Sequence, residues 1–175
     1  NAGFGNTDCS DFPRSAIEFD TGWIEFPRPK TEVNRRVPMW PETTEALKAA
    51  IDCRPNPKDE ADADCCFVTI QGNRWTRIKR GIADSSRFSK VDTVGNHFRS
   101  LLKTLGISGR HRLGFYTLRH TFATIAGESK DQVAVNAIMG HVDSSMAAVY
   151  RERISDERLK AVVDTVHKWL FDNKQ

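Results

Sequence analysis

The apolar residues change their spacing at Pro41, and this change constrains the fold more than any other feature of the sequence. Before Pro41 they come in short runs separated by turn residues, whereas after it many recur at intervals of three and four. The first pattern is typical of short β-strands and the second of amphipathic helices. The sequence therefore predicts an α+β fold that is mainly α, with a small antiparallel β-sheet near the N-terminus.

The predicted sheet has three strands. Asp20-Thr21-Gly22 supplies turn chemistry between the first two strands. A polar loop at 27–34 leads to the third strand, which Pro38 would confine to a sheet edge or a strand end. The strands are expected at 15–19, 23–26 and 35–39, and a further short extended piece at 66–70.

Helices are predicted from Pro41 to the end of the chain. Pro41 suits a first helical position, Gly106 can end a helix, and Ser155 is the expected N-cap of the last one. The later helices are expected at about 94–105, 117–127, 132–139, 143–150 and 156–171, with a surface loop at 54–64. The last helix should dock, on its own domain or on a neighbouring protomer, through an apolar face of Leu159, Val162, Val163, Val166, Trp169 and Leu170.

Length and composition limit the class of protein. We assign residues 1–175 to a single domain. No run approaches the roughly 18 apolar residues of a membrane span, so no membrane partner is expected. The four cysteines show no metal-ligand spacing, and we expect reduced thiols and no metal. Because the chain does not start with Met, we interpret it as a fragment of a longer protein, with Asn1-Ala2 as a tag remnant.

Positive charge is concentrated in one part of the sequence. Residues 71–120 hold eleven Lys and Arg residues and two acids, a net charge of +9, although the whole chain carries only +3. Residues 51–70 carry −3. A concentrated basic stretch is typical of a protein that binds a phosphate backbone. The DNA-binding residues expected within it are Arg74, Arg77, Lys79 and Arg80.

Three residues that suit phosphodiester chemistry follow near the C-terminus. Arg119, His141 and Tyr150 occur in the segments Leu-Arg-His-Thr-Phe-Ala-Thr, Gly-His and Val-Tyr, with separations of 22 and 9 residues. An arginine fork and a histidine can donate to phosphate oxygens on which negative charge develops, and a tyrosine can form a covalent phosphodiester link. Tyr116, three residues before Arg119, can point into the same site.

This arrangement resembles the second half of the catalytic motif of the tyrosine recombinase, or phage integrase, family. The resemblance implies the catalytic-domain fold of that family and a 3′-phosphotyrosyl intermediate at Tyr150. Lys30-Thr31, in the loop between strands, resembles the family's catalytic lysine turn, so Lys30 is implied as the acid that protonates the leaving 5′-oxygen. Since the covalent link conserves the phosphodiester energy, no cofactor is expected.

The resemblance also implies partners and a location. The partner would be double-stranded DNA, gripped in addition by an N-terminal domain upstream of this chain. A homotetramer is expected on DNA, and a monomer for the isolated chain. The setting would be the bacterial cytoplasm, in association with the nucleoid.

Two positions depart from the family's motif. The stretch from Gly3 to Asp8 resembles a motif that normally contains an arginine, but Gly5 stands at the arginine position. The missing positive charge could be supplied by another arginine, such as Arg14, Arg28 or Arg112. Tyr116 stands where the family favours histidine; its phenol can still donate a hydrogen bond. Two alternatives to a recombinase therefore remain: a degenerate copy that binds DNA without cutting it, and an enzyme with type IB topoisomerase-like activity.

Overall fold

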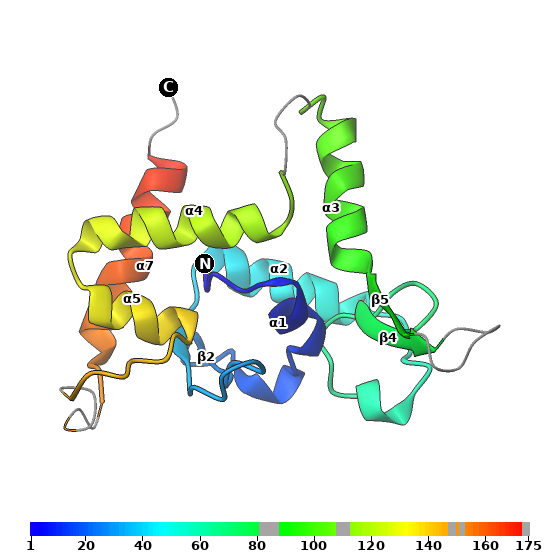
Figure 1. The fold of residues 1–175 in the computed structure, drawn as a ribbon, viewed down its shortest axis with the longest axis horizontal. Helices are drawn as coiled ribbons and strands as arrows, with labels where there is room; N and C mark the ends of the chain where they lie inside the picture. Colours follow the sequence, from blue (N-terminus) through cyan, green and yellow to red (C-terminus); the bar gives the residue numbers. More distant parts are fainter. Residues whose placement is uncertain (81–87, 108–112, 147–149, 151–152, 173–175) are drawn as a thin grey trace.

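Helices make up most of the regular structure in the computed structural model, which describes residues 1–80, 88–107, 113–146, 150 and 153–172 (Figure 1). This agrees with the predicted fold class, mainly α with a small antiparallel sheet. The elements in chain order are α1 (Asn6–Asp11), β1 (Ile17–Glu18), β2 (Trp23–Glu25), β3 (Arg36–Pro38), α2 (Pro41–Asp52), β4 (Thr76–Arg80), β5 (Phe88–Asp92), α3 (Thr93–Thr104), α4 (Tyr116–Ala126), α5 (Gln132–Met139) and α7 (Asp156–Phe171), with 3-10 turns at Arg14–Ala16, Glu60–Asp62 and Gly127–Ser129.

The first sheet has the strand order β1-β2-β3 and is antiparallel, as expected. Ile24 at its centre pairs with Ile17 on one side and with Val37 on the other. The strand predicted at 15–19 was too long. The chain turns there instead, since Ser15 Oγ donates to an Asp64 carboxylate oxygen at 2.5 Å and the Arg14 amide donates to the Asp64 carbonyl at 2.7 Å.

The short extended piece predicted at 66–70 pairs with no strand, and it ends in a turn that the Gly72 amide closes by donating to the Thr69 carbonyl at 2.7 Å. Cys66 and Val68 are buried nevertheless, and the Cys66 amide donates to the Phe12 carbonyl at 2.8 Å. The apolar run thus reflected burial rather than strand pairing.

The helix boundaries agree closely with the sequence pattern. Helix α2 begins at Pro41, and α3 ends before Gly106, whose φ is +69°. Ser155 occupies the N-cap position of α7, although its side chain makes no capping hydrogen bond. The helix expected at 143–150 includes residues 147–149, which lie outside the described residues. Among the helices in the described ranges, none is long and apolar enough to cross a membrane.

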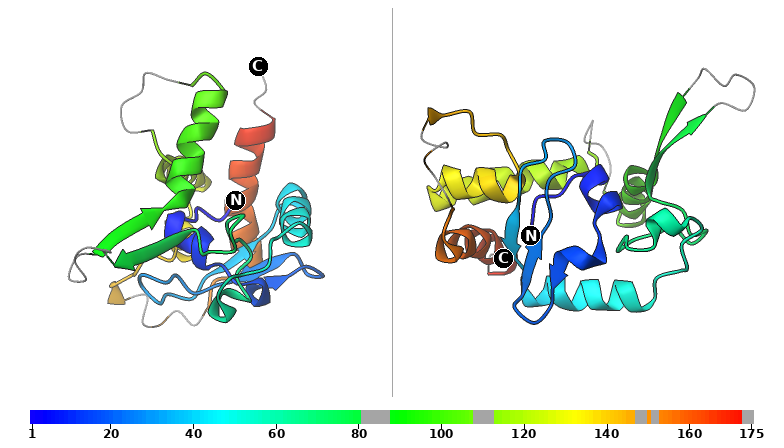
Figure 2. Two further views of the ribbon diagram at one scale, coloured as in Figure 1. Left: turned by 90° about the vertical axis from the view of Figure 1, so that its right-hand side faces the viewer. Right: turned by 90° about the horizontal axis from the view of Figure 1, so that it is seen from below.

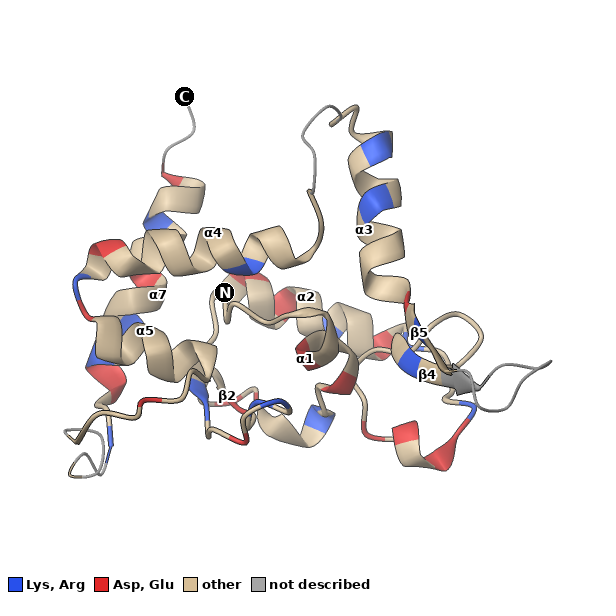
Figure 3. Cartoon of the chain, viewed as in Figure 1, with Lys and Arg blue, Asp and Glu red and all other residues tan. Residues whose placement is uncertain are grey.

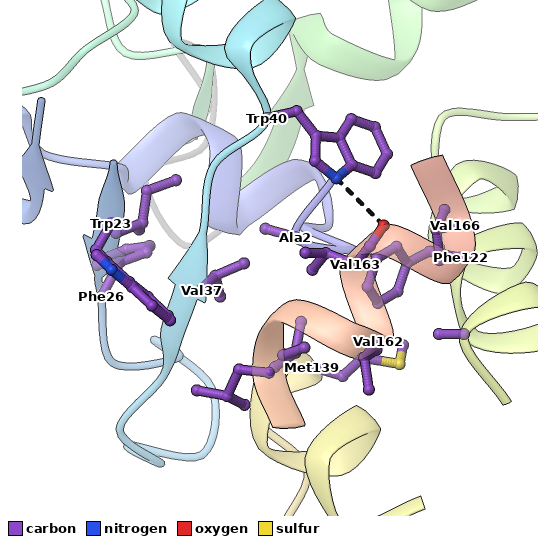
Figure 4. Close-up of a cluster of buried hydrophobic side chains, with 14 of the residues drawn as sticks. Ala2, Trp23, Phe26, Val37, Trp40, Phe122, Met139, Val162, Val163 and Val166 are labelled. Atoms are coloured by element: carbon purple, nitrogen blue, oxygen red, sulfur yellow. Dashed lines mark hydrogen bonds between the residues drawn. The ribbon is translucent and has the colours of Figure 1, made fainter. Parts of the chain in front are cut away.

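The main core lies where α7 packs against β3, α4 and α5 (Figure 4). Val163 and Val37 are buried there, and Trp40 Nε1 donates to the Val163 carbonyl at 3.2 Å. Helix α7 therefore docks on its own domain.

Leu170 and Trp169 take part only at the edge of this docking: they are 48% and 39% exposed, and they line an apolar cavity together with Phe122 and Val166. The last turns of α7 extend past α4 (Figure 1). Its buried residues are Leu159, Val162, Val163 and Val166.

A second region consists of the β4–β5 hairpin and α3, which stand apart from the main core (Figures 1 and 2). Helix α1 joins the two regions. Asn6 Nδ2 donates to the Asp92 carboxylate at 2.8 Å, and the Thr76 amide donates to Ser10 Oγ at 2.8 Å. The hairpin was not predicted, because its strands carry many charges and bury few apolar side chains. The alternation of Thr76 and Ile78 with Arg77 and Lys79 in β4 is the signal that could have revealed it.

Candidate functional site

The Arg119 side chain is buried at the base of the candidate site. Its position in the first turns of α4 places the side chain beneath the N-terminal segment and the end of α5, where the residue is only 2% exposed. Nη1 donates to the Gly3 carbonyl, and Nη2 donates to the Met139 carbonyl at 2.8 Å. These bonds fix the guanidinium before any ligand binds.

His141 follows directly on the end of α5. Gly140 caps that helix in the left-handed conformation, with φ +64°, and the His141 amide closes the turn on the Asn136 carbonyl at 2.9 Å. The imidazole Nε2 lies 3.0 Å from Arg119 Nη2 and accepts from it. Burial, then the charges of Arg119 and Arg28, lower the pKa of His141, so the unliganded imidazole is neutral at pH 7.

The loop between β2 and β3 covers this turn. Arg28 Nη1 and Thr31 Oγ1 both donate to the Gly140 carbonyl, at 3.3 and 3.0 Å. A Cβ on residue 140 would lie 2.8 Å from the Arg28 Cβ, so only glycine admits the loop at this distance. Lys30 lies within the docked loop and is exposed, with no hydrogen bond to Arg119 or His141 among the described residues.

Positive charge at the site has little compensation. The pKa of Arg119 is lowered by burial and then by the charge of Arg28. Arg35 lies beneath Gly140, and burial lowers its pKa to about 10, although Asp8 pairs with it at 3.2 Å. Within the described part of the chain, no ion pair involves Arg28 or Arg119. A partly buried cationic cluster with few matching carboxylates is suited to binding an anion.

Tyr116 and Gly5 lie at the edge of this cluster. A Cβ on Gly5 would lie 3.3 Å from Tyr116 Cε2, and the Gly5 amide donates to Asp8 Oδ2 at 2.7 Å. The Tyr116 ring is half exposed and makes an edge contact with His120, at 5.1 Å between ring centroids. Gly5 is thus close to Arg119, and an aromatic ring fills the space beside it.

Tyr150 differs from the other residues singled out in the sequence. Its side chain is 80% exposed, in a turn. No hydrogen bond joins it to Arg119 or His141 in the described residues. The structure therefore brings Arg119, His141, Tyr116 and the Lys30 loop together, and leaves Tyr150 in solvent.

The residues expected to contact DNA also differ from one another. Arg74 binds two carboxylates, those of Asp62 at 2.5 Å and Asp11 at 3.1 Å, so its charge is compensated within the chain. Arg77 Nη1 donates to the Arg74 carbonyl at 3.3 Å. The side chains of Lys79 and Arg80 lie outside the described residues. Other basic residues lie on α3 and β5, near the same end of the molecule (Figure 3).

The sequence offered Arg28 only as one of three arginines that could replace the one missing at Gly5, and Thr31 only as the neighbour of Lys30. It did not indicate that both contact Gly140. Both flank Lys30 in the loop that was singled out. The available signal was their position within the same eight-residue loop, 27–34, but the sequence does not show that this loop docks on Gly140.

Comparison with known proteins adds a family and a fold. The model of the phage integrase family matches residues 8–158. A search of curated proteins finds no match. Among solved structures, the XerA recombinase matches with a TM-score of 0.59 and 23% sequence identity, over 95% of this chain and 54% of that one.

A second structure is that of the Tn1549 transposon integrase in complex with transposon right end DNA. It matches with a TM-score of 0.60 and 18% identity, over 95% of this chain and 55% of that chain. This chain therefore spans about half the length of the structures that it matches. At these identities the likeness concerns the fold, and it confirms the expected tyrosine recombinase catalytic-domain fold.

Proposed function

Because the chain belongs to the phage integrase family, we propose that it is a site-specific recombinase domain that cleaves and rejoins DNA through a covalent 3′-phosphotyrosyl bond at Tyr150. The observation that carries the proposal is the cluster of Arg119, Arg28 and His141 without a paired carboxylate. Such a cluster fits one phosphodiester group, which offers two non-bridging oxygens to several fixed donors.

The proposed reaction exchanges one phosphodiester for another. The Tyr150 oxygen forms a bond to phosphorus and gives its proton to water, to which its side chain is exposed, while the bond from phosphorus to the 5′-oxygen breaks. Lys30, exposed on the loop that covers Gly140, would donate the proton that the leaving 5′-oxygen needs. Rejoining runs in reverse with an incoming 5′-hydroxyl, so neither ATP nor a metal ion has to supply energy.

Arg119 and His141 would stabilise the transition state. Three of the five N–H groups of Arg119 are used by Gly3, Met139 and His141. The Tyr116 side chain is a further hydrogen-bond partner of Arg119, so at least one N–H group remains for a phosphate oxygen. An anion beside His141 favours the protonated imidazole. Its Nε2–H would then donate to the phosphate instead of accepting from Arg119, which frees that Arg119 N–H for the phosphate as well. Fixed donors of this kind stabilise developing charge without reorganisation.

Double-stranded DNA is the proposed partner, and the related Tn1549 integrase was solved in complex with DNA. The exposed cations of the β4–β5 hairpin and of α3 would contact its backbone. We also propose that catalysis takes place in a homotetramer on DNA, in which partner strands are exchanged.

A trapping experiment tests the cleavage step. A pool of nicked duplexes of randomised sequence lets the short 5′-hydroxyl fragment diffuse away after cleavage, so that the covalent complex accumulates. We expect an adduct of protein and DNA that resists denaturation, and none with Tyr150→Phe. No adduct from the unmodified chain, together with retained duplex binding, would contradict cleavage.

Binding without cleavage is the second candidate function. The exposure of Tyr150 and the presence of Gly5 at the arginine position favour it. The trapping experiment separates it from a recombinase. Relaxation of a supercoiled plasmid without strand exchange would instead indicate type IB topoisomerase-like activity.

A further inference from the structure

Arg28 has no role in the sequence motif, yet the structure places it in the cationic cluster. It comes from the β2–β3 loop, its Nη1 donates to the Gly140 carbonyl at 3.3 Å, and its charge lowers the pKa values of both Arg119 and His141. We propose that Arg28 is the second phosphate-binding guanidinium of this site, opposite Arg119. This inference rests on the proposed function, since it names a further residue that holds the same phosphate.

The first argument is the electrostatic repulsion that Arg28 experiences beside Arg119 when no anion is bound. Arg28 is half-buried beside a second guanidinium that is almost fully buried, and like charges close together in a desolvated site repel one another. The nearest compensating carboxylate, Asp8, already pairs with Arg35 and accepts from the Gly5 amide. A bound phosphate would relieve this repulsion, because its negative charge faces both guanidinium groups.

The second argument is that the loop is built to hold Arg28 in this position. Because Gly140 has no side chain, the Arg28 Cβ can lie only 2.8 Å from where a Cβ on residue 140 would be. Thr31 Oγ1, in the same loop, donates to the Gly140 carbonyl at 3.0 Å. The bond from Nη1 to Gly140 uses one of five N–H groups. Four N–H groups therefore remain for an oxygen anion, and the side chain is partly exposed to solvent.

The third argument concerns the other arginines. Arg35 is buried and compensated by Asp8 and by the faces of Phe4 and Phe26. Arg14 is engaged elsewhere, with the Ala63 carbonyl and Asp64. At Gly5, the Tyr116 ring fills the space that a longer side chain would need. Of the two arginines that contact Gly140 in the described part of the chain, Arg28 is the one without a carboxylate partner, so it can supply a second positive charge. Arg112 lies outside the described residues.

Titration with inorganic phosphate at pH 7 and low ionic strength, followed by the amide signals of Gly140 and His141, tests the inference without DNA. In Arg28→Ala we expect the Kd to rise by about tenfold or more, as loss of a charge-assisted hydrogen bond predicts. Arg28→Lys keeps the positive charge but lacks the two-pronged guanidinium, so its Kd for phosphate should lie between those of the unmodified chain and Arg28→Ala. Arg14→Ala is the control and should bind as the unmodified chain does.

Thr31→Val separates contact from positioning. It removes the neutral bond from the loop to the Gly140 carbonyl and leaves the charge of Arg28 in place. We expect a much smaller loss of phosphate binding than in Arg28→Ala. Equal losses in both variants, equal losses in Arg28→Ala and Arg14→Ala, or unchanged binding in Arg28→Ala would each overturn the inference.

The trapping experiment distinguishes this inference from the proposed function. If the unmodified chain forms no adduct while Arg28→Ala loses phosphate binding, the proposed function fails and Arg28 keeps its role. If the adduct forms equally well with Arg28→Ala and phosphate binding is unchanged, the role of Arg28 fails alone.

Discussion

Arg119 and Tyr150, on which the proposed chemistry depends most, are held in opposite ways. Arg119 is 2% exposed and donates to two backbone carbonyls and to His141. Tyr150 is 80% exposed and forms no hydrogen bond within the described residues. The phosphate site is thus assembled by the fold itself, whereas the nucleophile is not fixed against it.

This difference separates two kinds of residue that a sequence motif lists together. The guanidinium of Arg119 contributes to folding as well as to anion binding, since it satisfies buried carbonyls. The phenol of Tyr150 contributes nothing to packing, so its role would be chemical alone. Apo structures often show such groups apart, and binding of the substrate brings them together.

Arg119→Ala should have the largest effect, because it lowers both the free energy of unfolding and the rate of cleavage. This variant leaves the Gly3 and Met139 carbonyls without their donor, at about 1–3 kcal/mol for each buried unsatisfied group. Loss of one donor to a developing charge should also slow adduct formation by on the order of 10²–10³. Chemical denaturation and the trapping assay measure the two effects.

Tyr150→Phe is the matched variant for Arg119→Ala. It should abolish the adduct while changing the free energy of unfolding by no more than about 0.5 kcal/mol, as for other surface substitutions. A strongly destabilised Tyr150→Phe, or a fully stable Arg119→Ala, would remove the contrast between the two residues.

Helix α7 shows the same contrast between buried and exposed residues on a smaller scale. Leu159 is 3% exposed and Leu170 is 48% exposed, although both belong to the predicted apolar face. We expect Leu159→Ala to lower the free energy of unfolding by about 2–5 kcal/mol, because it opens a cavity in the core. Leu170→Ala should change it by about 0.5 kcal/mol or less, and equal losses would contradict the packing of α7.

In the basic region, some cations are paired with carboxylates, and others have no carboxylate partner among the described residues. Lys90 is exposed on β5, whereas Arg74 is held by Asp11 and Asp62. We expect Lys90→Ala to make the slope of log affinity against log salt concentration less steep by about 0.9, the contribution of one phosphate contact. Arg74→Ala should leave that slope unchanged; a reversed order would show that Arg74 exchanges its carboxylates for DNA.

The smallest expected effect is a pH dependence from His141. Burial and two arginines hold the pKa of His141 below its usual 6.5, so the imidazole gains its proton only as the pH falls through that lowered value. DNA phosphates stay charged over this range and favour the protonated form, so duplex affinity should rise as the pH falls. His141→Gln should remove this rise, and an unchanged pH profile would exclude His141 from the phosphate site.

The sequence predicted the helices well because their signals are local. Pro41, Gly106 and Gly140 mark ends that depend only on backbone conformation near them. The β4–β5 hairpin and α1 were missed, since one is highly charged and the other is a short turn fixed by contacts with Arg35 and Asp92. Within the site, residue types at fixed spacing indicated Arg119 and His141, whereas Arg28 joins them only through docking of the β2–β3 loop.

Identification of the residue that carries DNA in the trapped complex tests the central claim most directly. The chain contains two tyrosines, Tyr116 beside the phosphate site and Tyr150 in solvent. Digestion of the adduct and mass spectrometry of the nucleotide-bearing peptide distinguish them. We predict a 3′-phosphate ester on Tyr150 alone; a nucleotide on Tyr116, or no covalent adduct at all, would contradict the proposed mechanism.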